Sequence, residues 1–502
     1  MNKFLCILGL ACSLEAVSQT FNHYITTEKT SWQKSTQKLE KKASATPLMT
    51  VSATEKGHEF RAWGTCFNEL NYDALLLLKP EEREKIMHDI FSPDGDLKFT
   101  RGRLTMNAND YSRSWYQCDS VAGDFQLRYF NIERDKQVTI PLVRMAQKYR
   151  PDITFWMSPW SPPSWMKINQ DYPVMPSPSN SADIRQEYLL FGTIGDLDPT
   201  EVEMAGTREG KFPKRLASQD YMIQDPRYLQ AYANMFSRFI DLYKEQDIPI
   251  DMVMYQNEAY SYTAYPGCAW TADGTILFNR DYLVPTIKKN NPDVDVYIGT
   301  FNTNRRDYVE KIVGALAKSD DGTELVKGVG LQWEGRENLD FLREKYPDLH
   351  LISTESECGR GRFDWRSGEH TFYLLHEYIG RGCNEYFIWN FILSDRGRSS
   401  WGWNQNSLIH VDSKSRTFRY TAEYYAVKHF SHFVEPGSTI VGFYPWNKEN
   451  AMQAIAFRNP DGKYIVIAGN TSDKEQALTF KLGSKYLNVS LPSHSFNSFV
   501  EK

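Results

Sequence analysis

Two glutamates interrupt apolar segments that otherwise have the composition of buried strands. In "MVMYQNEAYS" (252–261) the polar residues are Asn257 and Glu258, and in "LHLISTESECG" (349–359) Glu355 occupies the same kind of position. Hydrolysis of a glycosidic bond with retention uses two carboxyl groups about 5 to 5.5 Å apart, one as nucleophile and one as acid and then base. A fold that brings the two glutamates together would support this chemistry.

The segments around these residues alternate regularly between strand and helix patterns. Helical patterns, such as those over 79–91 and 227–246, separate eight short β-rich segments, which we expect at 60–66, 99–104, 153–159, 250–256, 295–300, 328–333, 349–355 and 385–391. Eight strands, each followed by a helix, predict an α/β fold, the (β/α)8 TIM barrel. An open doubly wound sheet has the same alternation, but it requires a phosphate-binding glycine loop, which does not follow the first expected strand.

In such a barrel the catalytic groups stand at the C-terminal ends of the strands. Glu258 and Glu355 fall at the ends of the fourth and seventh expected strands. We expect these two strands to face each other across the barrel, which would give the pair the short separation that retention requires. The two glutamates are therefore the catalytic candidates.

The last part of the chain follows a different pattern. After about residue 436, short alternating strands are separated by Pro, Gly and Asn turns, which is typical of a small β-sandwich. The strand-like "PLMTVSATE" (47–55) should join this sandwich from the other end of the chain. The expected order is a signal peptide, the N-terminal part of the sandwich, the catalytic barrel and the C-terminal part of the sandwich, at residues 1–18, 19–56, 57–435 and 436–502.

The N-terminus has the composition of a secretory signal peptide. An apolar run from Phe4 to Leu14 follows one lysine, and the small residues Ala16 and Ser18 precede the expected cleavage site. The run is too short to span a bilayer and no comparable stretch follows, so we expect no transmembrane segment. We expect a secreted or periplasmic protein, or one at the cell surface if Cys12 carries a lipid anchor, although the preceding residues fit a lipobox poorly.

The overall composition favours an uncharged partner. The net charge is −5, the pI is near 6.1, and no block of basic residues suggests a nucleic-acid partner. Aromatic residues make up 14% of the chain and offer flat faces on which sugar rings stack. The mature chain would keep five widely spaced cysteines, a pattern that indicates neither a disulfide scaffold nor a metal knuckle. We expect a carbohydrate partner and no metal or organic cofactor.

Several stretches resemble glycoside hydrolase family 30, which contains glucosylceramidases, β-1,6-glucanases, xylanases and β-xylosidases. They are "GTCFNEL", "RLTMNANDYS", "MSPWSPPSWMKIN", "YQNEAY", "STESECG", "YFIWNF" and "EYYAVKHFSHFVEPGS". The resemblance covers nearly the whole mature chain and implies a (β/α)8 barrel with a β-sandwich side domain built from both termini. It places the family's acid/base on Glu258 and its nucleophile on Glu355.

The same resemblance implies roles for other residues. Asn257 would hydrogen-bond the 2-hydroxyl of the sugar whose bond is cleaved, and Arg103 would hold the nucleophile ionised through its opposite charge. Asp110 matches an aspartate that binds sugar hydroxyls. Trp165 and Trp389 match tryptophans that line the sugar site, where a ring face suits the C–H face of a glucose.

The sequence also departs from the family at two places. Ala259 replaces the proline that often follows the acid/base glutamate, a change in loop stiffness rather than in chemistry. In "LQWEGR" (331–336) the chain places Gln332, Trp333 and Glu334 where glucosylceramidases carry an aromatic residue that reaches the nucleophile. Glu334 would be a third carboxylate near the pocket. The long segment over 170–224 is expected to encode substrate specificity.

These observations predict a retaining β-glycoside hydrolase that cleaves β-glucosidic linkages, either glucosylceramidase-like or an endo-β-1,6-glucanase. A β-xylosidase or xylanase of the same family is the close alternative, and a non-catalytic carbohydrate-binding barrel is disfavoured because both carboxylates are present. A lipid-binding protein is disfavoured because no amphipathic stretch with a basic face is found. If hydrolysis inverted instead, Glu334 or Glu357 would have to replace Glu355 in the pair.

Overall fold

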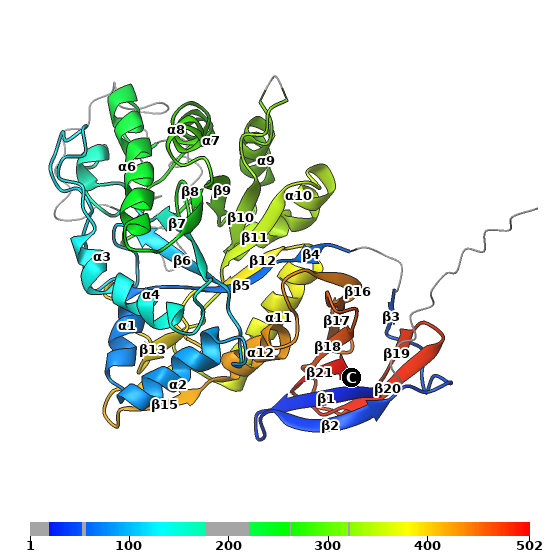
Figure 1. The fold of residues 1–502 in the computed structure, drawn as a ribbon. Coiled ribbons are helices and arrows are strands. Elements are labelled where there is room, and N and C mark those ends of the chain that lie inside the picture. Colours follow the sequence, from blue (N-terminus) through cyan, green and yellow to red (C-terminus); the bar gives the residue numbers. More distant parts are fainter. Residues whose placement is uncertain (1–19, 53–56, 176–219, 262, 320–321) are drawn as a thin grey trace, which may run out of the picture.

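A closed barrel of eight parallel strands forms the larger part of the molecule (Figure 1). The computed structural model describes residues 20–52, 57–175, 220–261, 263–319 and 322–502. In order around the barrel the strands are β5 (Ala62–Cys66), β6 (Arg101–Met106), β7 (Thr154–Pro159), β8 (Ile250–Met254), β9 (Asp295–Phe301), β10 (Gly328–Gln332), β11 (His350–Glu355) and β12 (Glu385–Ile388). The expected TIM barrel is confirmed.

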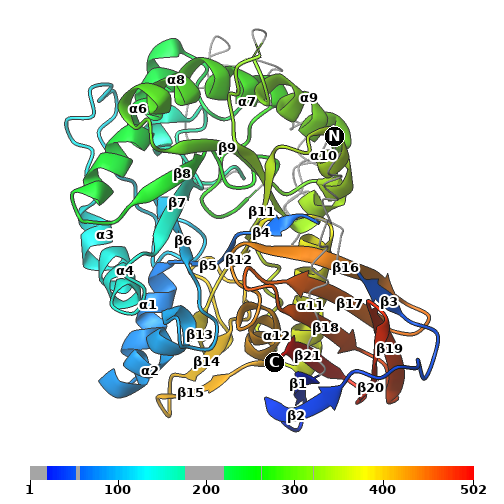
Figure 2. The same ribbon diagram turned by 45° about the vertical axis from the view of Figure 1, so that its right-hand side comes forward.

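Helices surround the barrel and cover the outer faces of its strands (Figures 1 and 2). Because both faces are covered, the strands carry apolar residues in continuous runs, and every residue of β5 and β10 is buried. The described helices are α1 (Glu69–Leu76), α2 (Pro80–Phe91), α3 (Glu133–Gln137), α4 (Thr139–Gln147), α6 (Pro226–Lys244), α7 (Ala272–Phe278), α8 (Val284–Asn290), α9 (Arg306–Leu316), α10 (Leu339–Lys345), α11 (Trp365–Gly380) and α12 (Ala422–Ser431). None of them has the length and apolar character needed to cross a membrane.

Large side chains fill the interior of the barrel. A buried cluster contains Trp156, Met252, Met254, Tyr297, Ile352 and Phe387, contributed by five different strands. The barrel interior is therefore a packed core rather than a pore, and the polar groups at the C-terminal strand ends lie above this core.

The expectation that the fourth and seventh strands face each other is wrong. Those strands are β8 and β11, and only β9 and β10 stand between them. In a ring of eight, the strand opposite β8 is four positions away, which is β12. Glu258 and Glu355 therefore approach each other over the ends of two intervening strands and not across the full width of the barrel.

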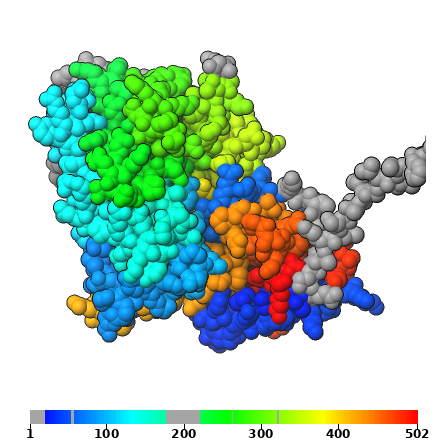
Figure 3. All heavy atoms as spheres, in the orientation of Figure 1, coloured from blue at the N-terminus to red at the C-terminus, as the bar shows by residue number. Residues whose placement is uncertain are grey.

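A β-sandwich built from both ends of the chain packs beside the barrel (Figure 3). Its larger sheet contains β1 and β2 from the N-terminal region, and β1 pairs antiparallel with β21, the last strand. Apolar residues of the two sheets meet in a separate core that includes Phe21, Val466, Phe480 and Phe499. The strands are β1 (Thr20–Thr27), β2 (Gln33–Lys38), β3 (Met49–Val51), β4 (Glu59–Phe60), β16 (Ser438–Asn447), β17 (Met452–Arg458), β18 (Tyr464–Asn470), β19 (Gln476–Leu482), β20 (Lys485–Leu491) and β21 (Ser495–Glu501).

Helix α12 connects the two parts through a buried polar contact. The His429 ring bonds the Ser498 hydroxyl over 2.8 Å and the Thr26 hydroxyl over 2.9 Å, so one side chain joins the barrel to both termini. Burial lowers the pKa of His429 well below its usual value, which keeps the ring neutral. Three short strands after β12 complete the fold: β13 (Ile392–Ser394), β14 (Ile409–Asp412) and β15 (Thr417–Tyr420).

Candidate active site

The two glutamates stand at the C-terminal edge of the barrel, one at a strand end and one in a loop. Glu355 is the last residue of β11, and Glu258 follows β8 by four residues. Glu258 has a positive φ of 49°, and its backbone N–H donates to the Thr300 hydroxyl over 3.0 Å. The exposed fractions are 9% for Glu258 and 6% for Glu355, so both carboxyl groups lie in a largely dehydrated pocket.

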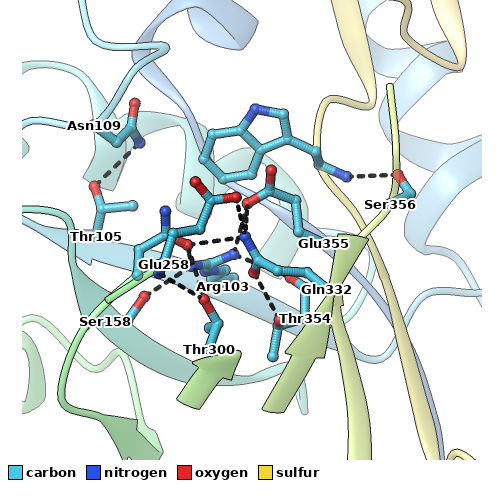
Figure 4. A network of polar contacts seen from close by, with 12 residues as sticks. Arg103, Thr105, Asn109, Ser158, Glu258, Thr300, Gln332, Thr354, Glu355 and Ser356 are labelled. Carbon is cyan, nitrogen blue, oxygen red and sulfur yellow. Dashed lines mark hydrogen bonds and ion pairs between the residues drawn. The ribbon is translucent and has the colours of Figure 1, made fainter. Parts of the chain in front are cut away.

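Gln332, the last residue of β10, joins the two carboxylates. Its amide nitrogen donates to Glu258 Oε1 over 2.9 Å and to Glu355 Oε2 over 3.3 Å (Figure 4). The Thr354 hydroxyl donates to the amide oxygen over 2.8 Å, which fixes the nitrogen toward the glutamates. Since one atom touches both oxygens, these oxygens are at most the two distances combined apart, about 6.2 Å.

Arg103 holds the other side of Glu355 with a fully buried guanidinium. Its Nη1 donates to Glu355 Oε2 over 3.2 Å, and its Nη2 donates to Asn257 Oδ1 over 2.8 Å and to the Ser158 hydroxyl over 3.0 Å. The rings of Trp156, Trp160 and Trp389 surround its charge, with centroids 4.6, 4.4 and 5.5 Å away. A buried charge requires such compensation, and Arg103 is therefore fixed in place.

Burial and mutual repulsion raise the pKa values of two carboxyl groups in this pocket, Glu355 and Asp110. Burial raises the pKa of Glu355 above its usual value, the Arg103 charge lowers it, and the negative charges of Glu258 and Asp110 raise it again. Burial, reinforced by the charge of Glu258, raises the pKa of Asp110 to about 8. Burial therefore favours the protonated form of Asp110 at neutral pH, in which it can donate a hydrogen bond.

Glu258 also has donors on the side away from Glu355. Its Oε2 accepts hydrogen bonds from the Ser261 hydroxyl over 3.1 Å and from the Tyr265 hydroxyl over 3.0 Å. The carboxyl group is thus held at both oxygens, with Oε1 directed toward Gln332 and Oε2 toward the loop after β8. These hydrogen bonds hold each carboxyl oxygen of Glu258 in a fixed direction.

The other residues expected from the sequence are distributed unevenly around this pair. Asn257 lies in the network, because its Oδ1 accepts from Arg103, from Thr300 and from Gln332. Trp389 is fully buried and stacks on Trp160 with centroids 5.1 Å apart, so it supports Arg103. Trp333 and Glu334 begin a short 3-10 helix after β10 (Trp333–Asn338) and are half-buried.

The contacts of Trp165 are with residues other than the two glutamates. Its ring packs on Phe125 and Tyr228, and its indole N–H donates to the Asp119 carbonyl over 3.1 Å. The tryptophan that reaches the network from the same "SPWSPPSW" stretch is Trp160. Sequence reasoning did not single out Trp160 or Tyr265, since nothing in their spacing distinguishes a ring that faces Arg103 or Glu258 from an ordinary core ring.

Some expectations fall outside the described residues. These are the signal peptide over 1–18, including Cys12, and most of the segment 170–224. The remaining five cysteines are buried free thiols: Cys66, Cys118, Cys268, Cys358 and Cys383. Within the described ranges, no group of three or more His, Cys, Asp or Glu side chains is arranged to hold a metal ion.

Comparison with family models identifies both parts of the chain. Residues 60–177 and 216–434 match the model described as "Glycosyl hydrolase family 30 TIM-barrel domain". Residues 437–499 match "Glycosyl hydrolase family 30 beta sandwich domain". The first match alone spans more than half of the chain.

Relatives of the chain are distant in sequence, but the similarity covers most of their length. The chain is 22% identical over 478 residues to the lysosomal acid glucosylceramidase of Mus musculus, covering 90% of this chain and 83% of that protein. It is 21% identical over 475 residues to the endo-1,6-β-D-glucanase neg1 of Aspergillus fumigatus, covering 91% and 88%. The crystal structure of SrfJ from Salmonella typhimurium has the same fold, with a TM-score of 0.79, 17% identity and coverage of 96% and 99%.

Proposed function

The chain belongs to glycosyl hydrolase family 30, and from this membership we propose that it hydrolyses β-glucosidic linkages with retention of configuration. Glu355 is the nucleophile and Glu258 is the acid/base. The relatives named as a glucosylceramidase and as an endo-1,6-β-D-glucanase support a glucose unit at the cleaved bond.

The observation that carries this proposal is the amide of Gln332 between the two carboxylates. Retaining enzymes place their carboxyl groups about 5 to 5.5 Å apart, whereas inverting enzymes need about 6.5 to 9.5 Å to admit a water molecule. The limit of about 6.2 Å between Glu258 Oε1 and Glu355 Oε2 lies below the inverting range. This short separation of the two facing oxygens supports direct attack by a carboxylate.

The reaction proceeds in two displacements. Glu355 attacks the anomeric carbon while the Glu258 carboxylic acid protonates the oxygen of the departing group, which leaves as an alcohol. Glu258, now ionised, takes a proton from a water molecule. The oxygen of that water attacks the same carbon and releases Glu355 as a carboxylate. Arg103 favours ionised Glu355 at the start of the cycle and again at its end.

Asn257 and Asp110 supply polar groups for the sugar. The three donors on Asn257 Oδ1 orient the amide so that its nitrogen is the group left to meet a hydroxyl oxygen. Asp110 holds a proton at neutral pH and serves as a donor to a second hydroxyl. These contacts would distinguish glucose from a sugar lacking the corresponding hydroxyl.

A mechanism-based label tests the assignment. A 2-deoxy-2-fluoro-β-glucosyl fluoride should inactivate the enzyme with time, because the fluorine slows breakdown of the covalent intermediate. Peptide mass spectrometry should then find the sugar on Glu355. A label on Glu334 or Glu357 would contradict the assignment, and a 2-fluoro-xylosyl reagent that labels faster would identify a xylosidase.

We also propose that the protein is exported, because its first 18 residues have the composition of a signal peptide. N-terminal sequencing of the protein recovered from its native host should begin near Gln19. A mature N-terminus at a lipid-modified Cys12 would instead indicate a tethered form, and an intact Met1 would contradict export through this segment.

A further inference from the structure

Two sets of aromatic side chains lie on loops near Glu258, and the turn that carries Trp401 and Trp403 joins them. One set is Tyr265 with Trp403 and the other is Trp401 with Tyr172 and Trp115, and we call the five together the aromatic rim. It begins at the acid/base, since Tyr265 donates to Glu258 Oε2, and the Tyr265 ring contacts Trp403 with centroids 4.9 Å apart. The proposed chemistry of the glutamates uses none of the rings beyond Tyr265.

The other half of the rim is continuous through ring contacts. Trp401 lies 6.2 Å from the ring of Tyr172, and its indole N–H donates to the Tyr172 hydroxyl over 3.4 Å. Tyr172 stacks on Trp115 with centroids 5.1 Å apart and an interplanar angle of 24°. All five rim residues are half-buried, so each keeps part of its surface in solvent.

The rim is assembled from separate loops at the C-terminal edge of the barrel. Trp115, Tyr172 and Tyr265 follow β6, β7 and β8, and the two remaining tryptophans lie between β13 and β14. The turn that carries them is closed by the Ser399 N–H, which donates to the Trp403 carbonyl over 2.8 Å. The Ser400 hydroxyl donates to the Ser112 carbonyl over 2.6 Å, which ties this turn to the loop after β6.

The position of the rim relative to the pair defines which part of a substrate it can meet. Glu258 Oε1 faces Glu355 through Gln332, whereas Oε2 faces Tyr265 and the rim. The acid/base protonates the departing oxygen and the nucleophile attacks the anomeric carbon from the opposite face, so the departing group lies on the Glu258 side of the cleaved bond. Tyr265, the first residue of the rim, contacts Glu258 on that side, and its ring contacts Trp403.

We propose, resting on the function given above, that the aromatic rim binds the departing part of the substrate and that this part is itself a sugar chain. Tyrosine and tryptophan combine an apolar ring face with a polar hydroxyl or N–H, which matches the C–H faces and hydroxyls of a sugar ring. A lipid tail would favour aliphatic lining.

Two substrates separate binding at the rim from the chemistry. β-1,6-linked gluco-oligosaccharides of two to five units require a bound departing sugar, whereas β-glucosyl fluoride has a departing group of one atom. Trp401→Ala and Trp403→Ala should each lower kcat/KM for the oligosaccharides by about tenfold or more, as loss of a stacked ring predicts. Neither should change kcat/KM for the fluoride by more than about twofold, which also shows that the variants fold. Trp401→Phe should recover part of the loss.

The control is Trp446→Ala, which removes a tryptophan that is 42% exposed on β16 of the sandwich. This variant should leave kcat/KM for both substrates unchanged. Equal losses on the fluoride and the oligosaccharides would overturn the proposal, because the rim would then support the catalytic pair only. Unchanged kcat/KM for the oligosaccharides would overturn the proposal, because the rim would then bind no departing group. A loss confined to octyl β-glucoside would also overturn it, because the rim would then bind an apolar departing group. A wild-type enzyme inactive on every β-glucosyl substrate would instead contradict the proposed function.

Discussion

The Arg103 guanidinium donates to the Glu355 carboxylate over 3.2 Å from a position with no solvent exposure. Two buried opposite charges in contact stabilise each other, but neither is stable alone, because an unpaired buried charge costs several kcal/mol. The ionisation of Glu355 and the stability of the folded barrel therefore depend on the same arginine.

Replacing this arginine should change both activity and stability. The Arg103 charge lowers the pKa of Glu355, so Arg103→Met should raise this pKa and move the acidic limb of the kcat/KM profile to higher pH. Unfolding in urea should show a loss of about 3 to 5 kcal/mol. Arg103→Lys, which keeps the charge, is the control and should move the limb less. An acidic limb that stays in place in Arg103→Met would show that Arg103 does not set the ionisation of the nucleophile.

Removing the amide of Gln332 should shift the acidic limb of the pH profile. Its nitrogen donates to the Glu355 carboxylate, which favours the ionised form, so Gln332→Met should raise the pKa of Glu355. A hydrogen bond to a charged group contributes about 1.5 to 3 kcal/mol, so the acidic limb should move to higher pH by about one to two pH units. The measurement is kcat/KM from pH 4 to 9 on an aryl β-glucoside. An acidic limb that stays in place would contradict a role of Gln332 in the ionisation of Glu355.

Glu258→Ala should separate substrates by their leaving groups. Oligosaccharides and alkyl glucosides need the lost proton donor, whereas a dinitrophenyl glucoside does not, and its kcat/KM should stay close to that of the wild type. Azide should restore turnover by attacking the intermediate, and the product should be β-glucosyl azide. Glu355→Ala is the matched variant, and its activity on the dinitrophenyl glucoside should be lost.

Asp110 should make stability fall as the pH rises. Its pKa is about 8 in the folded chain, against a usual value of 3.8, so the folded state retains a proton that the unfolded chain has released between these values. The stabilisation from this proton is complete below pH 3.8 and is lost progressively up to about pH 8. Asp110→Asn does not titrate, so its Tm relative to wild type should rise between pH 5 and pH 8. A constant difference in Tm would show that Asp110 is ionised throughout.

The barrel could be predicted from the sequence because its strands are buried on both faces. Segments such as Gly328–Gln332 are continuously apolar or small and end in polar residues, so both their type and their functional end are visible. The N-terminal strand Gln33–Lys38 was not predicted, because it is polar and mostly exposed, without alternation. Its conformation depends on pairing with β1.

The site could be predicted as far as backbone position determines it. The two glutamates were predicted because strand ends converge in a barrel, and Arg103 was expected from the resemblance to the family. The bridging role of Gln332 was not, since it depends on the side-chain orientation that the Thr354 hydroxyl fixes. Trp165 was expected to line the sugar site from the resemblance to the family, whereas the contact of Trp160, from the same stretch, with Arg103 was not predicted.

The stereochemistry of the product tests the central claim most directly. Proton NMR of a β-glucoside reaction, recorded in the first minutes before mutarotation, should show the β-anomer of glucose appearing first. That result follows from two displacements at one carbon by carboxylates held together through Gln332. If the α-anomer appeared first, the attacking group would be water, and Glu334 or Glu357 rather than Glu355 would have to complete the pair with Glu258.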